Sequence, residues 1–375
     1  MGSEYKDNFE KSFEKELFNG NDKKINRKRK QREIAMEVIL ALVLVWAVIA
    51  TLFSVYLVVF EGKFQNGISD TGNQAIEIVS SNDMEDKIFA AKQEARTEFL
   101  NELKQKMLTG NGSVQMLREY FPEEIVYLKG GEYKFFPIVD ALNKNPYANI
   151  DFKQDEETKI VEAYDDGNLV SSFGIDVSKH NGEIDWETLK TTDVDFAIIR
   201  LGFRGFETGK LVLDEQFENN LEGVNRVGMD YGVYFYSQAI SEEEAIEEAE
   251  FLLENIEGYV LDFPIIIDIE LSDAYTERNE NLTIEQRTDF CIAFCKRIEE
   301  AGYETMIYGN VVTFMELLDI TRLEQYKKWF AFYDDTYYYP YDFEIWQYSN
   351  TGILSGINEK VDFNILFEKD KIYQP

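Results

Sequence analysis

The fold of this chain is decided by the stretch Pro264-Ile265-Ile266-Ile267-Asp268-Ile269-Glu270. Its run of β-branched residues is typical of a buried β-strand. Side chains alternate between the two faces of a strand, so Asp268 and Glu270 are expected on the same side. Two carboxylates at a buried strand end lose hydration and repel each other, which drives their pKa values apart. The alternative is a strand end at which two acids simply meet solvent.

From residue 171 onward, segments predicted as strands alternate with segments predicted as helices. The expected strands are Phe173–Val177, Phe196–Leu201, Gly232–Tyr236, Pro264–Glu270, Thr305–Tyr308, Trp329–Tyr333, Glu344–Tyr348 and Val361–Phe363; the expected helices are 185–190, 214–227, 241–256 and 284–301. This alternation indicates an α/β fold, a parallel (β/α) barrel with its active site at the C-terminal ends of the strands. The late connections are short, so residues 171–375 are expected to form an irregular, TIM-like barrel with some helices missing.

Charge is distributed very unevenly along the 375 residues. Residues 1–34 hold ten Lys or Arg against seven acids, and we expect them to form a basic cytoplasmic tail. The other residues carry the strong excess of acids that gives the whole chain a formal charge of −33. An acidic body of this kind argues against nucleic acid as a partner, because little positive charge is left to neutralise phosphates.

A stretch of 23 residues without a charge, Val38 to Phe60, follows the basic tail. At helical rise it spans roughly 34 Å, enough to cross a hydrocarbon core of about 30 Å. We therefore predict a transmembrane helix over 35–60 that anchors the chain in the lipid bilayer. The preceding basic residues place the N-terminus in the cytoplasm and the rest outside the cell, as a single-pass membrane protein. A cleaved signal peptide would have a shorter apolar core, and a buried core helix would be amphipathic.

Two further segments separate this span from the barrel. Residues 61–110 read as a linker and an amphipathic helix, with apolar positions that recur every three or four residues from Met84 to Met107. The apolar stripe of the 75–108 helix is expected to pack on a neighbouring domain or to pair with a second copy. Residues 111–170 contain a hairpin signal around Lys129-Gly130-Gly131-Glu132 and are predicted to form a small α+β domain that acts as a spacer.

Acids and aromatic residues gather at the predicted strand ends. The acids are Asp176, Asp268, Glu270 and Asp362, and the aromatic residues are Tyr236, Tyr308 and Trp346. In a closed barrel the first and last strands are neighbours, so Asp176 and Asp362 are expected to share one rim. A protonated acid beside an ionised one suits the cleavage of a glycosidic bond, and aromatic rings stack on sugar faces. Tyr236 and Trp346 taken singly are as easily explained as core residues.

At these positions the sequence resembles the glycoside hydrolase family 25 muramidases, which are lysozymes that cleave bacterial peptidoglycan. The matching motifs are Phe173-Gly174-Ile175-Asp176-Val177-Ser178, Ile184-Asp185-Trp186, Phe196-Ala197-Ile198-Ile199-Arg200, Tyr231-Gly232-Val233-Tyr234-Phe235-Tyr236-Ser237, Pro264 to Glu270, Ile345-Trp346-Gln347-Tyr348-Ser349 and Val361-Asp362-Phe363-Asn364. They occur in order over about residues 172–367. The resemblance implies an enzyme that hydrolyses the β-1,4 bond between N-acetylmuramic acid and N-acetylglucosamine. Together with the predicted span Val38 to Phe60, it leads us to expect a membrane-anchored muramidase.

The resemblance also implies roles for the site residues. Glu270 would be the general acid, Asp268 would assist on the other side of the sugar, and Asp176 and Asp362 would complete the carboxylate cluster. Three aromatic residues would line the substrate groove, namely Tyr236, Tyr308 and Trp346. The family retains anomeric configuration and uses no metal or other cofactor.

Other residue types add little to this picture. Cys291 and Cys295 lie four apart on one predicted helix and read as small buried hydrophobes rather than a disulfide. His180, the sole histidine, is assigned no catalytic role, and the sequence predicts no metal site. Two rival functions stay open: a related hydrolase acting on another polysaccharide, and a catalytically silent wall-binding module.

Overall fold

The structure is a computed structural model that describes residues 74–108, 113–271, 277–334 and 336–368. The chain divides into two compact units, residues 1–103 and residues 104–375. Helix α2 (Gln74–Leu108) begins in the first unit and confirms that this segment is helical, but its apolar and polar residues are hardly separated into two faces along its length. Several of its apolar side chains are exposed, among them Met84, Ile88 and Phe99.

The predicted membrane span, Val38 to Phe60 within 35–60, lies outside the described residues, as does the tail 1–34. Among the helices that the structure does describe, none is both long enough and apolar enough to cross a bilayer.

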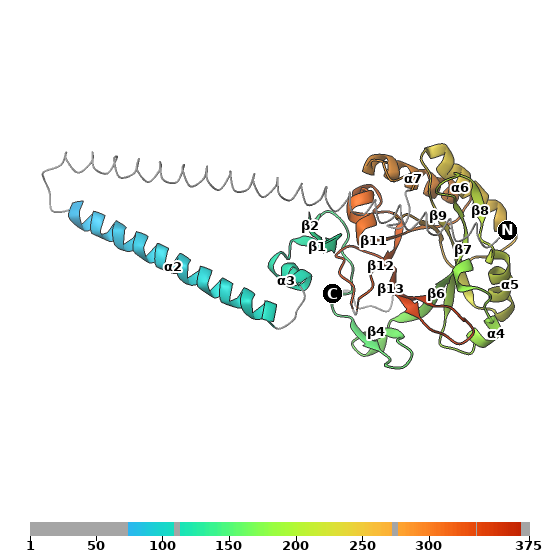
Figure 1. Cartoon of the computed structure of the whole chain (residues 1–375), viewed down its shortest axis with the longest axis horizontal. Helices are drawn as coiled ribbons and strands as arrows, with labels where there is room; N and C mark the ends of the chain where they lie inside the picture. The colour runs from blue at the N-terminus through green and yellow to red at the C-terminus, as the bar shows by residue number, and fades with distance from the viewer. Residues whose placement is uncertain (1–73, 109–112, 272–276, 335, 369–375) are drawn as a thin grey trace, which may run out of the picture. The chain divides into compact units, whose positions relative to one another are not determined.

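In the described part of the second unit, eight strands close into a barrel (Figure 1). Their order around the sheet is β6-β14-β13-β12-β11-β10-β9-β7, and β7 pairs with β6 to complete the ring. A short strand, β8, extends β7 as a hairpin. The strands are β6 (Ser171–Val177), β7 (Phe196–Arg204), β8 (Leu211–Leu213), β9 (Asp230–Tyr236), β10 (Ile265–Asp268), β11 (Thr305–Asn310), β12 (Lys327–Ala331), β13 (Ile345–Gly352) and β14 (Val361–Phe367).

The last strand departs from the predicted parallel barrel. The ring strands β6, β7, β9, β10, β11, β12 and β13 pair in parallel, whereas β14 is antiparallel to both of its neighbours, β13 and β6. The short connection before β14 explains this difference, because a parallel pairing needs a crossover of a dozen residues or more. As a consequence, the start of β14 rather than its end reaches the mouth of the barrel.

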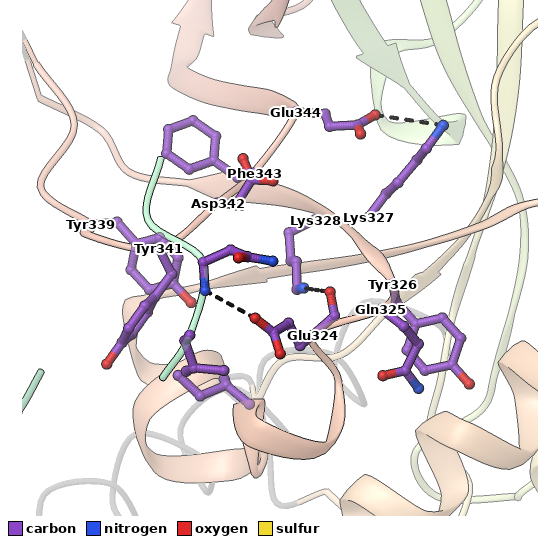
Figure 2. Close-up of a pocket in the computed structure, with 13 residues that line it drawn as sticks. Glu324, Gln325, Tyr326, Lys327, Lys328, Tyr339, Tyr341, Asp342, Phe343 and Glu344 are labelled. Carbon is purple, nitrogen blue, oxygen red and sulfur yellow. Dashed lines mark hydrogen bonds and ion pairs between the residues drawn. The ribbon is translucent and has the colours of Figure 1, made fainter. Parts of the chain in front are cut away.

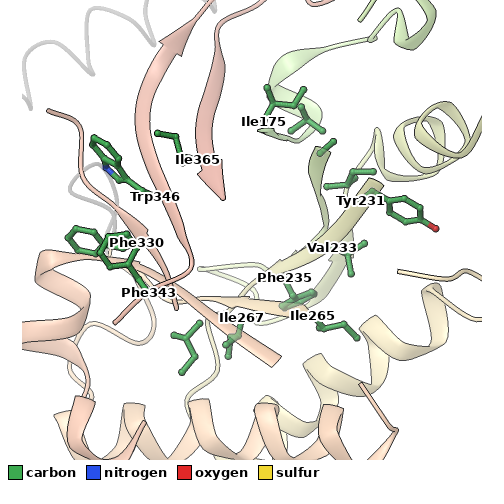
Figure 3. Packing of buried hydrophobic residues seen from close by; sticks show 14 of the residues in the cluster. Ile175, Tyr231, Val233, Phe235, Ile265, Ile267, Phe330, Phe343, Trp346 and Ile365 are labelled. Carbon is green, nitrogen blue, oxygen red and sulfur yellow. The ribbon is translucent and has the colours of Figure 1, made fainter. Parts of the chain in front are cut away.

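Alternation along each strand separates an inner from an outer set of side chains. The inner set includes Phe196, Ile198, Ile266, Met306 and Trp329, which pack together inside the ring. The residues next to them along the strands face outward into a much larger cluster, and Figure 3 shows part of this outer layer. It includes Ile175, Val233, Phe235, Ile265, Ile267, Phe330 and Trp346. The inner side chains fill the barrel as a packed core. Polar side chains take their place at the C-terminal ends of the parallel strands.

Helices cover the barrel on the side of the early strands. They are η1 (Lys179–Asn181), α4 (Trp186–Leu189), α5 (Phe217–Val227), α6 (Glu242–Asn255) and α7 (Ile284–Glu300). Thr283 and Gln286 form a reciprocal capping box at the start of α7, which fixes where this helix begins. The buried thiols of Cys291 and Cys295 both lie in α7 and are free, as predicted. After β11 only short turns follow, η2 (Thr313–Leu317) and η3 (Ile320–Arg322), so the predicted loss of late helices is confirmed in the described residues.

Residues 113–169 take the place of the missing helices. This segment contains α3 (Ser113–Tyr120), the hairpin β1 (Glu124–Lys129) and β2 (Glu132–Pro137), and a small sheet of β3 (Asp151–Gln154), β4 (Val161–Asp165) and β5 (Asn168–Leu169). The Tyr147 hydroxyl donates to the Phe343 carbonyl at 2.5 Å, and the Tyr147 ring stacks on Phe367. Buried residues of the segment 113–169 belong to the same hydrophobic cluster as the residues on the barrel's outer face. The predicted spacer domain over 111–170 is therefore not a separate domain in the structure; it is a wall of the barrel.

Candidate active site

Four carboxyl groups meet at the mouth of the barrel. Asp176 near the end of β6 lies opposite Asp362 near the start of β14, as strand neighbours. Asp268 ends β10, and Glu270 follows two residues later. Between them Ile269 faces the outer cluster, so the two acids point to the inner side as predicted. Asp176 and Asp268 are 6% and 5% exposed, so both carboxyl groups sit in a largely dehydrated site.

Two of the predicted aromatic residues flank Asp268. The strand register places Tyr308 of β11 on one side of Asp268 and Tyr236 of β9 on the other. Because the three residues share one face of adjacent strands, their side chains reach the same end of the barrel. The structure thus brings together six of the seven residues that the sequence singled out.

A set of directed hydrogen bonds holds Asp176. Its Oδ2 atom accepts from Gln347 Nε2 and from Asn364 Nδ2, each at 2.8 Å. The Oε1 atom of Gln347 accepts from the hydroxyls of Tyr308 and Tyr333, also at 2.8 Å each. With its oxygen occupied by two donors, the Gln347 amide must turn its NH2 group toward Asp176.

The Asn364 amide is oriented in the same way. The Trp329 indole donates to Asn364 Oδ1 at 2.8 Å, which leaves the NH2 group of Asn364 for Asp176. Both amides are buried, and both present donors to one carboxylate oxygen. Such donors stabilise the charged form of a carboxylate and oppose the penalty of its burial.

The carboxyl groups of Asp176 and Asp362 differ in how strongly each holds a proton. Burial, the nearby charge of Asp176 and the hydrogen bond between the two side chains raise the pKa of Asp362 to about 9. Burial also raises the pKa of Asp176, but the amide donors, the hydrogen bond from Asp362 and the charge of Arg200 all act in the opposite direction. We therefore assign the proton to Asp362 and the negative charge to Asp176 at neutral pH.

The pKa values of the second pair, Asp268 and Glu270, are also raised. Burial, followed by the charges of Glu277 and Asp176, raises the pKa of Glu270 to about 7. Burial and the charge of Glu270 raise the pKa of Asp268 well above its ordinary value. Asp268 Oδ1 is buried and lacks a hydrogen-bond partner among the described residues. The cluster can hold protonated and ionised carboxyl groups side by side, as general acid–base chemistry requires.

Sequence reasoning missed two groups that complete this environment. Arg200 on β7 projects inward, and its Nε atom donates to Asp214 Oδ2 at 2.7 Å. Glu277, which follows the loop after β10, accepts a hydrogen bond of 2.8 Å from the Tyr236 hydroxyl and is 5% exposed. Arg200 follows the alternation of the inward-facing Phe196 and Ile198, so its position could have been predicted from the strand pattern. Glu277 lies outside helices and strands and shows no periodic signal.

The prediction that Trp346 lines the substrate groove is wrong. Trp346 is fully buried, faces the outer layer, and donates from its indole nitrogen to the Phe332 carbonyl at 2.8 Å. Its ring packs edge-on against Phe152 of the N-terminal segment. The next residue along β13, Gln347, faces inward and takes the place at the mouth, because neighbouring residues on a strand point to opposite faces.

The buried position of Trp346 has a measurable consequence. Trp346→Phe is expected to lower the free energy of unfolding by about 2 kcal/mol, since it leaves a cavity and a buried carbonyl without its donor. It should leave kcat/KM within about twofold of the wild-type value, because the ring does not touch the mouth. Chemical denaturation and steady-state kinetics check these two expectations. A raised KM with unchanged stability would contradict the assignment.

A separate pocket at the opposite end of the barrel does not belong to this site. Its volume is about 260 Å³, and it is lined where β12 begins and just before β13, by residues such as Glu324, Lys327 and Glu344 (Figure 2). Glu324 accepts from the backbone of Asn143 at 3.0 Å, and Lys327 lies 3.8 Å from Glu344. The contact with Asn143 joins the N-terminal segment to the barrel, and both contacts fit a structural role at this end of the fold.

Comparison with known proteins fits the geometry of the mouth. Residues 175–357 match the model of the family described as Glycosyl hydrolases family 25. This range is just under half of the chain, and over it the protein is similar to the family 25 glycoside hydrolases. Two residues of the carboxylate network, Asp362 and Asn364, lie beyond the matched range but are joined to it by the pairing of β14 with β6.

Individual relatives are distant. The uncharacterized protein YegX of Escherichia coli K12 is 26% identical over 199 residues, which cover 51% of this chain and 68% of YegX. The modular autolysin LytC of Streptococcus pneumoniae has a TM-score of 0.48 and 22% identity, over 64% of this chain and 58% of the autolysin. A bacterial lysozyme from Streptomyces coelicolor has a TM-score of 0.46 and 23% identity, over 52% of this chain and 91% of the lysozyme. This chain therefore spans less than two thirds of the autolysin.

Proposed function

We propose that this protein is a membrane-anchored muramidase that cleaves the β-1,4 bond between N-acetylmuramic acid and N-acetylglucosamine in peptidoglycan. One observation carries the proposal: a buried carboxylate cluster at the mouth of a barrel similar to the family 25 glycoside hydrolases, with pKa values driven apart. A cluster of this kind supplies a proton to a leaving oxygen while a neighbouring negative charge stabilises the sugar cation that forms.

Each carboxyl group has a separate task in this proposal. Glu270 holds a proton near neutral pH and gives it to the glycosidic oxygen as the bond to the anomeric carbon breaks. Water then adds to the anomeric carbon and returns a proton to Glu270. Asp268 orients the N-acetyl group of the substrate on the other side of the sugar ring. Asp176 remains charged under its two amide donors and stabilises developing positive charge, and protonated Asp362 donates to it. Tyr236 and Tyr308 flank Asp268 and position the sugar.

The raised pKa of Glu270 sets the expected pH dependence. A group with a pKa of about 7 carries its proton below pH 7 and loses it above. The rate of hydrolysis should therefore fall as pH rises through 7, and by about tenfold per pH unit well above it. A pH–rate profile of reducing-end release from purified peptidoglycan measures this. A rate that stays level from pH 6 to pH 9 would show that Glu270 is not the acid.

The location is proposed from the sequence of the N-terminal region. The uncharged stretch Val38 to Phe60 and the basic residues before it support an anchor with the barrel outside the cell. Tethering would raise the local concentration of the enzyme at the wall and would suit local remodelling or opening of that wall. Protease added to intact cells should cut the barrel and spare a tag at the N-terminus. Protection of the barrel under these conditions would contradict the orientation.

The decisive test separates an enzyme from a silent wall-binding module. The full chain in detergent is incubated with purified peptidoglycan, and both the new reducing ends and the wall-bound protein are measured. Wild type should release reducing ends, while Glu270→Gln should bind the wall and release almost none. Equal and negligible release by both proteins would favour the binding module. Release from another polysaccharide but not from peptidoglycan would favour a different substrate.

A further inference from the structure

A groove lies at the same end of the barrel as the carboxylate cluster. It has a volume of about 890 Å³, and its two walls come from distant parts of the chain. One wall is the β3–β4 hairpin, from which Gln154 and Lys159 line the groove. The other wall is the end of β13 together with Ile353, the residue after it, and Asn350 lines the groove on this side. Its volume is within the range of binding sites for small molecules, which is about 300 to 1,000 Å³.

The groove opens on the same end of the barrel as the active site. Its lining includes Tyr333, which follows β12, and the last residues of β13, and both positions are at the C-terminal ends of barrel strands. Tyr333 also donates to Gln347 Oε1 at 2.8 Å, and Gln347 in turn donates to Asp176 at 2.8 Å. One side chain therefore belongs both to the groove and to the hydrogen-bond network of the catalytic cluster.

The hairpin wall is built as a fixed element. Asp155 Oδ1 accepts from the backbone nitrogens of Glu157 and Thr158, which closes the turn at the tip of the hairpin. Directly after this turn, the Val161 backbone nitrogen donates to the Tyr348 hydroxyl at 3.1 Å. The outward-facing residues of β13 thus hold the hairpin, while Gln347 between them reaches the catalytic acids. The hairpin precedes residues 175–357, so this wall lies outside the range that matches family 25.

The lining combines an aromatic ring with neutral hydrogen-bonding groups. The side chain of Tyr333 belongs to a residue that is 52% exposed, and Ile353 is 76% exposed. Amide and hydroxyl side chains are present on both walls, including Gln154, Asn350 and Thr351. A ring that stacks on a sugar face, with amides for hydroxyl and acetamido groups, suits a saccharide. The charged residues of the lining are one base, Lys159, and two acids, Glu157 and Asp334. This excess of negative charge does not favour a polyanion as the ligand.

We infer that this groove binds the glycan strand on one side of the cleaved bond, as an extension of the catalytic mouth. The inference rests on the proposed muramidase function and adds a site for a longer substrate. Occupation of the groove would hold an N-acetylated saccharide chain against Tyr333, and so against the network that orients Asp176. The enzyme would then bind long glycan strands more tightly than short fragments.

Binding to uncut glycans of two lengths tests this inference. Labelled oligosaccharides of alternating N-acetylglucosamine and N-acetylmuramic acid, with four and eight sugars, are titrated onto full-length Glu270→Gln, which should not cleave them. The groove variant adds Gln154→Ala and Asn350→Ala, one exposed amide from each wall. The matched control adds Gln325→Ala and Asn143→Ala, the same residue types at the pocket on the opposite end of the barrel.

The groove variant should bind the eight-sugar chain about tenfold more weakly, which corresponds to two lost hydrogen bonds, and the four-sugar chain within about twofold. The control should match the parent for both, and thermal melting should be alike in all three proteins. Unchanged affinity for the eight-sugar chain would overturn the inference, as would an equal loss for both chains. A loss seen only when the glycan carries stem peptides would assign the groove to peptide instead. Failure of the muramidase function itself would show separately, as no reducing ends released by the unmodified chain.

Discussion

Glu270→Gln is expected to lower the rate of peptidoglycan hydrolysis by roughly a thousandfold, within the range that a general acid contributes. Glutamine has nearly the shape of a protonated glutamate, but it has no proton to give to the leaving oxygen. Reducing-end release at pH 6, where Glu270 is protonated in wild type, gives the clearest comparison. Glu280→Gln is the matched control, because Glu280 lies exposed in the same loop region, and it should keep wild-type activity.

The same substitution should stabilise the fold at high pH. Burial raises the pKa of Glu270 from 4.5 to about 7, so the folded state binds this proton more tightly than the unfolded state does. Ionisation therefore destabilises the folded protein as pH rises from about 4.5, and the full penalty is present above 7. Glu270→Gln removes that penalty, which amounts to about 3 kcal/mol at pH 8 and to little at pH 4. A variant that loses both activity and stability at pH 8 would indicate a folding defect instead of a missing acid.

Gln347→Glu should disrupt the cluster from its other side. The substitution replaces the NH2 donor of Gln347 by an oxygen that faces Asp176 Oδ2, at a position where the present contact is 2.8 Å. Two buried carboxylates at this distance repel each other, so activity at pH 7 should fall on the order of a hundredfold, as for loss of a preorganised donor. The free energy of unfolding at pH 8 should fall by about 3 kcal/mol.

The pH dependence of that loss distinguishes repulsion from simple misfit. The introduced carboxyl group would have a raised pKa, so at low pH it is protonated and can donate to Asp176 in place of the amide. The stability deficit should therefore shrink as pH is lowered from 8 to 5, as measured by denaturant unfolding. Gln325→Glu, at the exposed opposite end of the barrel, should show no comparable loss. A deficit of the same size at both pH values would contradict the proposed orientation of the Gln347 amide.

The prediction of the site from the sequence depends on how side chains alternate between the two faces of each strand. It placed Asp268 and Glu270 on one side of β10 and Asp176 at the end of β6, because the apolar pattern fixes which side is buried. The same reasoning could not choose between Trp346 and Gln347, which lie on opposite faces of β13. A tryptophan is the residue expected to stack on a sugar, but in the structure its ring packs against Phe152 on the outer face.

Long-range packing was beyond what the local pattern could show. The alternation Val361-Asp362-Phe363-Asn364 is the same whether β14 runs parallel or antiparallel, so the pattern did not reveal that Asp362 sits at the strand's beginning. The turn residues Lys129 to Glu132 predict a hairpin, but turn chemistry does not say what a hairpin packs against. Contacts of residues 113–169 with the barrel, such as Tyr147 with Phe343, join residues about 200 positions apart.

The identity of the new chain end tests the central claim most directly. Purified peptidoglycan is digested with the full chain, the new reducing ends are reduced with borohydride, and the resulting sugar alcohols are identified by mass spectrometry after hydrolysis. A muramidase exposes N-acetylmuramic acid at each cut, so we predict that muramitol appears with wild type and is absent with Glu270→Gln. Glucosaminitol in its place, or equal yields from wild type and Glu270→Gln, would contradict the proposed function.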